Sequence, residues 1–291
     1  MRKPLTYLTG VMITLLMIFC LLGLTAGALV RCKAAQPDTF TGIIRSKDLA
    51  EKVHEHLTVY FTEQENVTGI PASVYERSVT AEKLRPMLLD TAEQAFLYLD
   101  GRTDYIGISP DMTELKEDLT AFFEQYAAEN GYERDSKYDE VLTNAIRSAT
   151  NNIKSACDVY RFSLLGDAGV MKKVRRALPH TKYLMIGCGA GIAVLLLILL
   201  MLHRQDKPAV LYWFGSAVLV SSLLMLIPAA WLQITHWFDR FAVKSDQVFA
   251  AVTGYLYTMT GTVITVSVIG IVLALCLYLF SGILRQRSAK A

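Results

Sequence analysis

The stretch "YLMIGCGAGIAVLLLILLML", residues 183–202, decides the fold of this chain. It holds 20 consecutive residues without Asp, Glu, Lys or Arg. A helix of about 20 apolar residues is long enough to cross the roughly 30 Å hydrocarbon core of a bilayer. Three further runs also lack these charged residues, at 4–30, 209–234 and 248–284. The sequence therefore predicts an all-α protein with four transmembrane helices.

The glycines of this stretch allow two interpretations. A dinucleotide-binding loop needs Gly-x-Gly-x-x-Gly between a strand and an amphipathic helix, but Ile192 stands where the third glycine is required. Gly187 and Gly191 instead have the four-residue spacing that lets membrane helices approach closely. We therefore expect helix packing, within one chain or between copies. The predicted packing residues are Gly23, Gly27, Gly187, Gly191, Gly270 and Ala274.

The runs divide the chain into seven predicted segments. The N-terminal apolar run is longer than the roughly 7–15 residues of a cleaved signal peptide, so an uncleaved anchor is favoured, although Ala26-x-Ala28 resembles a cleavage site. The predicted segments are 1–31 (signal anchor and first span), 32–182 (acidic extracytoplasmic helical domain), 183–203 (second span), 209–234 (third span), 235–257 (interfacial amphipathic segment), 258–284 (fourth span) and 285–291 (basic cytoplasmic tail).

Charge sets the predicted orientation. Short cytoplasmic loops carry an excess of Lys and Arg. With the N-terminus inside, the short cytoplasmic pieces hold seven basic residues: Arg2, Lys3, Arg204, Lys207, Arg285, Arg287 and Lys290. The opposing loop between the last two spans holds only Arg240 and Lys244. We expect a multi-pass plasma-membrane protein with both termini cytoplasmic and residues 32–182 outside.

The domain between the first two spans is acidic and has basic flanks. Residues 37–170 contain 24 Asp and Glu against 13 Lys and Arg, a net charge of −11. Basic residues beside a bilayer gain about 1 kcal/mol each from anionic headgroups. We therefore expect a basic collar, a set of residues that hold the domain at the lipid surface. The collar is Arg31, Lys33, Lys172, Lys173, Arg175, Arg176 and Lys182. No aromatic platform accompanies it, so nucleic acid is not an expected partner.

The five cysteines do not form a disulfide framework. Cys20, Cys188 and Cys276 lie in apolar runs, where cysteine behaves as a small hydrophobic residue. Cys32 and Cys157 flank the acidic domain and are a candidate disulfide in an oxidising compartment. Spacing alone does not show that their Cα atoms come within bridging distance.

Apolar residues in the acidic domain recur at helical spacing. The clearest stripe follows Asp111 and Glu114, which form a candidate capping box, and ends at Gly131. No strand alternation is present, and four or five amphipathic helices can bury one core. The predicted stripes are Leu49, Val53, Leu57, Tyr60 and Phe61; Leu84, Leu88, Ala95 and Leu99; Met112, Leu115, Leu119, Phe122 and Tyr126; and Tyr138, Leu142, Ala145, Ala149, Ile153, Ala156 and Tyr160.

Motifs for catalysis are missing from the sequence. His54 and His56 are two residues apart, whereas a helical zinc pair is four apart, and no Cys/His spacing suggests a metal site. No Gly-x-Ser-x-Gly or Walker motif occurs. The sequence therefore predicts no catalytic residues, no metal and no cofactor, although 24 carboxylates leave a glycosidase-like pair open.

Three functional classes are compatible with these features. The first is a non-enzymatic accessory, sensory or assembly subunit of an envelope complex, which acts through lipid, through membrane or envelope partners, or by self-association. The second is a permease-like component that works with a separate ATPase, although the cytoplasmic pieces are short for a coupling surface. The third is an envelope enzyme. The sequence favours the first class.

Overall fold

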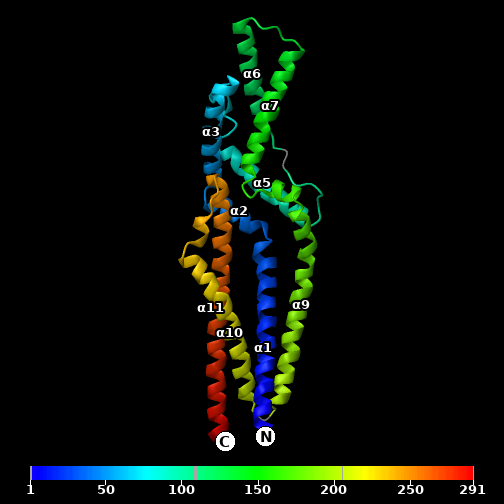
Figure 1. The fold of residues 1–291 in the computed structure, drawn as a ribbon, viewed down its shortest axis with the longest axis vertical. Helices are drawn as coiled ribbons and strands as arrows, with labels where there is room; N and C mark the ends of the chain where they lie inside the picture. Colours follow the sequence, from blue (N-terminus) through cyan, green and yellow to red (C-terminus); the bar gives the residue numbers. More distant parts are fainter. Residues whose placement is uncertain (1, 108–109, 205, 291) are drawn as a thin grey trace. The chain divides into compact units, whose positions relative to one another are not determined.

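A computed structural model describes residues 2–107, 110–204 and 206–290, and every element in those ranges is helical (Figure 1). This confirms the predicted all-α class. The α-helices are α1 (Arg2–Leu29), α2 (Pro37–Ser46), α3 (Leu49–Thr68), α4 (Ser73–Glu76), α5 (Ala81–Leu99), α6 (Thr113–Asn130), α7 (Ser136–Cys157), α8 (Phe162–Asp167), α9 (Val170–Leu202), α10 (Lys207–Ile234) and α11 (Asp246–Lys290). A π-helix, η1 (Val30–Ala34), and a 3-10 helix, η2 (Trp237–Arg240), complete the described elements.

The chain divides into two compact units. The bundle unit comprises residues 1–36, 176–240 and 256–291, and the head unit comprises residues 37–175 and 241–255. The chain therefore passes between the units four times. Two of these passages fall inside continuous helices, α9 and α11.

Four helical segments, which lie wholly or mostly in the bundle unit, are long and apolar enough to cross a membrane, in agreement with the predicted number of spans. These segments are Tyr7–Ala34, Val170–Leu202, Lys207–Ile234 and Asp246–Gln286, the second and fourth of which begin in the head unit. Both ends of the chain lie at the same end of the bundle as the turn between α9 and α10 (Figure 1). Arg285 pairs with Asp206 there at 3.6 Å.

Helices α1 and α9 are in contact through glycines. A Cβ atom added to Gly23 would lie 2.8 Å from Cys188 Sγ, and one added to Gly27 would lie 2.7 Å from Met185 Cγ. A Cβ atom on Gly191 would lie 3.2 Å from Cys20 Sγ. A Cβ atom on Gly187 would meet nothing within 4 Å. Three of the four glycines predicted on these two helices therefore lie at their contact, and Gly187 does not.

Helices α10 and α11 also pack through small residues. A Cβ atom on Gly270 would collide with Ser222 Oγ, and Ala274 is fully buried. The carbonyl oxygen of Ala274 lies 3.5 Å from the position of a Cβ on Gly215. Such close approach brings hydroxyl groups within hydrogen-bond reach, and these bonds stabilise helix pairs in lipid by about 0.6 kcal/mol each on average. The donors and acceptors are Thr260 Oγ1 to Gln233 Oε1 (2.8 Å), Tyr278 Oη to Ser216 Oγ (2.9 Å) and Ser281 Oγ to the Pro208 carbonyl (2.7 Å).

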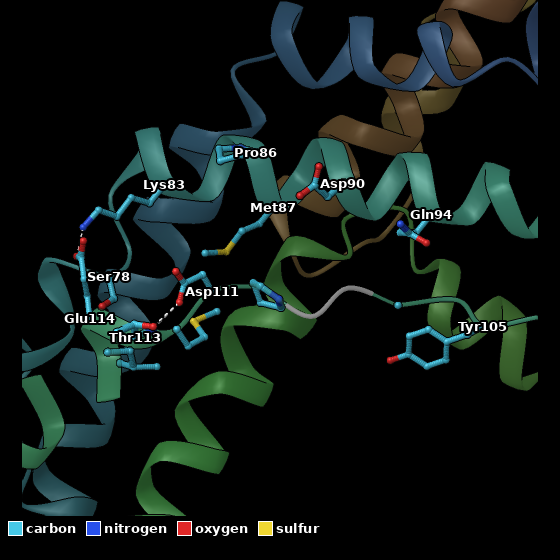
Figure 2. A pocket seen from close by; sticks show the side chains of 14 residues that line it. Ser78, Lys83, Pro86, Met87, Asp90, Gln94, Tyr105, Asp111, Thr113 and Glu114 are labelled. Carbon is cyan, nitrogen blue, oxygen red and sulfur yellow. Dashed lines mark hydrogen bonds and ion pairs between the residues drawn. The ribbon is translucent and has the colours of Figure 1, made fainter. Parts of the chain in front are cut away.

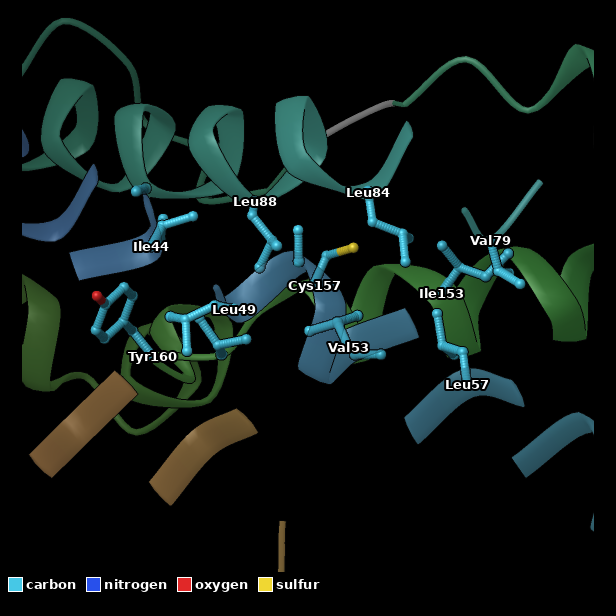
Figure 3. Packing of buried hydrophobic residues seen from close by; sticks show 14 of the residues in the cluster. Ile44, Leu49, Val53, Leu57, Val79, Leu84, Leu88, Ile153, Cys157 and Tyr160 are labelled. Atoms are coloured by element: carbon cyan, nitrogen blue, oxygen red, sulfur yellow. The ribbon is translucent and has the colours of Figure 1, made fainter. Parts of the chain in front are cut away.

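The head unit is built around one apolar core (Figure 3). The predicted stripes of α3 and α5 supply much of it, and Leu49, Val53 and Leu84 are fully buried. In α6 and α7 the stripes are buried only in part. Leu119 and Ile153 are fully buried, whereas Tyr126 is 48% exposed. The core therefore covers one end of the α6–α7 hairpin and leaves the aromatic residues near its turn accessible.

The predicted interfacial segment, residues 235–257, is divided between the units. Residues 237–240 form η2 in the bundle unit, and the first ten residues of α11 belong to the head unit. Ala251 is fully buried in the head core. The ring of Tyr255 stacks on Phe40 with centroids 4.8 Å apart. The location of this segment at a lipid interface stays a prediction.

The glycine contact between α1 and α9 can be tested by a matched pair of substitutions. Gly23→Val should lower the thermal unfolding temperature of the detergent-solubilised protein, because overpacking a close contact costs about 1–3 kcal/mol. Gly187→Val should leave it unchanged, because open space surrounds that position. Tryptophan fluorescence on heating reports the transition. Equal effects of the two valines would contradict the α1–α9 contact described above.

Candidate functional site: a groove along α5

An open pocket of about 720 Å³ lies in the head unit (Figure 2). We call it the α5 groove. One wall is α5, and the described residues of the other are Tyr105, Gly107 and residues 110–112 together with the first turn of α6. Its described lining residues are Ser78, Lys83, Pro86, Met87, Asp90, Gln94, Tyr105, Gly107, Pro110, Asp111, Met112, Thr113, Glu114 and Leu115.

One face of α5 forms the long wall. Lys83, Met87, Asp90 and Gln94 follow one another at steps of four, three and four residues, which places them on the same side of a helix. Leu84 and Leu88 point to the other side and are buried in the head core. The apolar stripe therefore fixes the helix against the core and leaves the polar face on the groove. At 1.5 Å per residue, this face runs for about 16 Å.

The start of α6 forms the opposite wall. Asp111 Oδ1 accepts hydrogen bonds from Thr113 N (2.9 Å) and Thr113 Oγ1 (2.5 Å). The carboxylate of Glu114 accepts a hydrogen bond from the ammonium group of Lys83 on α5. The predicted capping box of Asp111 and Glu114 is therefore wrong, because α6 begins at Thr113 and Glu114 turns toward α5 instead of its own helix end.

The groove is negatively charged. The hydrogen bonds from Thr113 lower the pKa of Asp111, and the hydrogen bond from Lys83 lowers the pKa of Glu114, so both carboxyl groups are ionised at neutral pH. Asp90 adds a third carboxylate, with no hydrogen-bond or ion-pair partner in the described ranges. Lys83 is the one cation among the described lining residues, and Glu114 already binds it. The carboxylate oxygens left without a partner among the described residues are therefore those of Asp90, the second oxygen of Asp111 and Oε1 of Glu114.

Ser78 lies at the Lys83–Glu114 end of the groove (Figure 2). The residue is 5% exposed, and its hydroxyl oxygen is buried without a hydrogen-bond partner in the described part of the chain. An unsatisfied buried polar group costs about 1–3 kcal/mol, so such groups are uncommon in folded proteins. The groove thus has a hydroxyl oxygen at its edge with which a bound molecule could form a hydrogen bond.

The lining of the groove combines charged groups with apolar side chains. No histidine is among the described lining residues, and the imidazole Nδ1 of His54 lies 2.7 Å from the carbonyl oxygen of Val79, the residue that follows Ser78. Across the described residues, no group of three or more His, Cys, Asp and Glu side chains is placed to hold a metal ion. Met87 and the 6% of Met112 that is exposed supply apolar surface between the charged groups, and Leu115 lies fully buried behind them.

The predicted collar residues are distributed over both units. Six of the seven are exposed: Arg31, Lys33, Lys172, Lys173, Arg176 and Lys182. Arg175 is half-buried in the head unit, where it donates to Asp104 (3.0 Å) and lies 5.0 Å from the ring centre of Tyr98. This arginine is therefore held by the head, and the contact of the other six with lipid headgroups stays a prediction.

The two cysteines of the candidate disulfide lie in different units. Cys32 is exposed in η1, Cys157 is 1% exposed in the head core, and both are free thiols. Burial raises the pKa of Cys157 to about 12, so its thiol stays protonated and unreactive in the folded head.

Sequence reasoning identified only part of the groove. It singled out Asp111 and Glu114, but as a helix cap. A polar stripe through Lys83, Asp90 and Gln94 was detectable from its helical spacing. The approach of Ser78 was not, because it depends on how the turn after α4 packs on α5 and α6.

Comparisons with known proteins add no relative. No protein family matches the chain, and neither the curated proteins nor the solved structures contain a significant match.

The unpaired hydroxyl of Ser78 gives a testable result. Ser78→Ala should leave the ligand-free protein as stable or raise its stability by up to about 1 kcal/mol, because it removes an unsatisfied buried group. The matched control is Ser163→Ala. The Ser163 side chain donates to the buried carboxylate of Asp158, so its loss should destabilise by about 1–3 kcal/mol. Thermal unfolding in detergent measures both, and a similar loss in Ser78→Ala would show that its hydroxyl is bonded.

Proposed function

We propose that this chain is a non-enzymatic accessory or sensory subunit of an envelope complex in the plasma membrane. The head unit is its recognition domain and lies outside the cytoplasm. Support comes from the four apolar helices, from the acidic groove in the head and from the course of α11.

The course of α11 is the observation that carries the proposal. Ala251 and Tyr255 belong to the head core, and the same uninterrupted helix continues as the fourth candidate span to Gln286. If the head unit served only as a passive anchor, the start of the helix that forms the fourth candidate span would not need to lie inside the head core. Binding that favours one packing of the head therefore acts directly on a helix that enters the membrane.

The distribution of basic residues supports the orientation. Seven Lys and Arg lie in the N-terminal, α9–α10 and C-terminal pieces, which meet at one end of the bundle, against two in the α10–α11 loop. The proposed arrangement places that basic end in the cytoplasm. Head residues then face the outside of the cell.

Cysteine labelling tests the orientation. In a Cys32→Ser background, Ser148→Cys places an exposed thiol on α7, and Arg204→Cys places one beside the α9–α10 turn. A membrane-impermeant maleimide should label the first variant in intact cells and the second only after lysis. The reverse pattern would invert the proposed topology. The same labelling of both variants before lysis, or of neither, would contradict a membrane span between the head and the α9–α10 turn.

Purification tests the functional class. Affinity purification in mild detergent, with in-cell cross-linking, should recover a membrane or envelope protein at near-stoichiometric amount, and the cross-links should map to the head unit. An unrelated four-span protein purified in parallel supplies the background. A stoichiometric ATPase would instead support the permease-like alternative and overturn the proposal.

A further inference from the structure

We propose that the α5 groove binds a linear aliphatic polyamine, with ammonium groups at Asp90 and Asp111 and the methylene chain along Met87 and Met112. This inference rests on the proposed role of the head as a recognition domain. It goes further by assigning the groove and the chemical class of its ligand.

The charge and its spacing select a cation with separated charges. Asp90 comes from α5, whereas Asp111 and Glu114 come from opposite sides of the α6 start. Because these groups do not gather into a metal-binding cluster within the described residues, a single small ion fits them poorly. A chain with two or three ammonium groups can donate hydrogen bonds to carboxylates along the groove, and charge-assisted bonds of this kind are among the stronger ones.

The shape of the groove suits an extended ligand. In Figure 2 the lining side chains are strung along α5, with Lys83 and Glu114 at one end and Gln94 and Tyr105 at the other. The α5 face covers about 16 Å at 1.5 Å per residue. Bulky or flat ligands have less support, since Tyr105 is the one aromatic side chain among the described lining residues. A quaternary ammonium ligand is normally held by an aromatic cage, so primary and secondary amines are favoured.

The walls of the groove match the methylene chain of a polyamine, and its two ends offer acceptors for the amine groups. Methionine side chains adapt their shape to neighbouring groups, so Met87 and Met112 can cover a methylene chain. Ser78 has an unpaired hydroxyl at the Lys83–Glu114 end, and an amine of the ligand satisfies it by donating to the oxygen. Tyr105 and Gln94 supply further acceptors at the opposite end.

Spermidine binding to the full-length protein tests this inference. The protein is placed in nanodiscs of phosphatidylcholine, because anionic lipids would themselves bind a polyamine, and binding is measured by calorimetry at constant ionic strength. One saturable site is expected. Asp90→Asn should weaken it about fivefold to tenfold, because one charge-assisted bond is lost. Ser78→Ala should weaken it about threefold without lowering the stability of the ligand-free protein.

The matched control is Glu93→Gln. Glu93 is exposed on α5 three residues from Asp90 and lies outside the groove lining, so the same change of charge there should weaken binding by less than about twofold, through screened attraction alone. Equal weakening by the two variants would overturn the proposal, because it would reveal diffuse attraction to an acidic head. Displacement by Mg²⁺ at matched ionic strength, or no saturable binding, would also overturn it. The cross-linking and purification experiment uses no polyamine, so the proposed function and this ligand assignment can fail separately.

Discussion

The structure depends on one constraint: a backbone in hydrocarbon must satisfy its own hydrogen bonds, because no water is present to do so. Uncharged runs such as residues 183–202 meet this constraint as helices. Between helices in lipid, apolar burial is not a driving force, and close approach becomes the source of attraction. The contacts of Gly23 and Gly27 with α9, and of Gly270 with α10, follow from this requirement.

A structural feature can be predicted from this sequence when it follows from the local spacing of residues. It cannot be predicted when it depends on which other helices pack against it. Charge-free runs predict the four spans, and helical spacing predicts the faces that α3 and α5 bury. Periodicity identifies an apolar face but not what covers it, which is why Leu119 is buried and Tyr126 on the same stripe is 48% exposed. Likewise, Gly187 has the spacing of a packing residue, yet the rotation of α9 leaves it without a neighbour. Rotation and cover depend on tertiary packing.

The same distinction applies to the groove. The polar stripe on α5 follows from local spacing, as does the bond between Asp111 and Thr113 two residues apart. The pairing of Glu114 with Lys83 joins residues 31 positions apart, and it competes with the local capping interaction that the sequence suggests. The participation of the α11 start in the head core is the largest feature that the sequence did not reveal. An apolar run of 37 residues is equally compatible with a helix that starts at a lipid interface and with a helix that starts in the core of a polar domain.

The acidity of the head does not by itself explain selective binding in the groove. The head unit holds 25 Asp and Glu against 17 Lys and Arg, and this net charge of −8 attracts every cation. The Debye length at physiological ionic strength is about 8 Å, however, so exposed carboxylates beyond that distance contribute little. Selectivity must come from groups that contact the ligand and are already in position. Thr113 holds Asp111 by two hydrogen bonds, and α5 is fixed by Leu84 and Leu88 in the core. The carboxylate of Asp111 therefore loses little side-chain entropy on binding, whereas a mobile surface carboxylate must be ordered first. A groove of this kind can therefore distinguish an extended polycation from a salt of the same ionic strength.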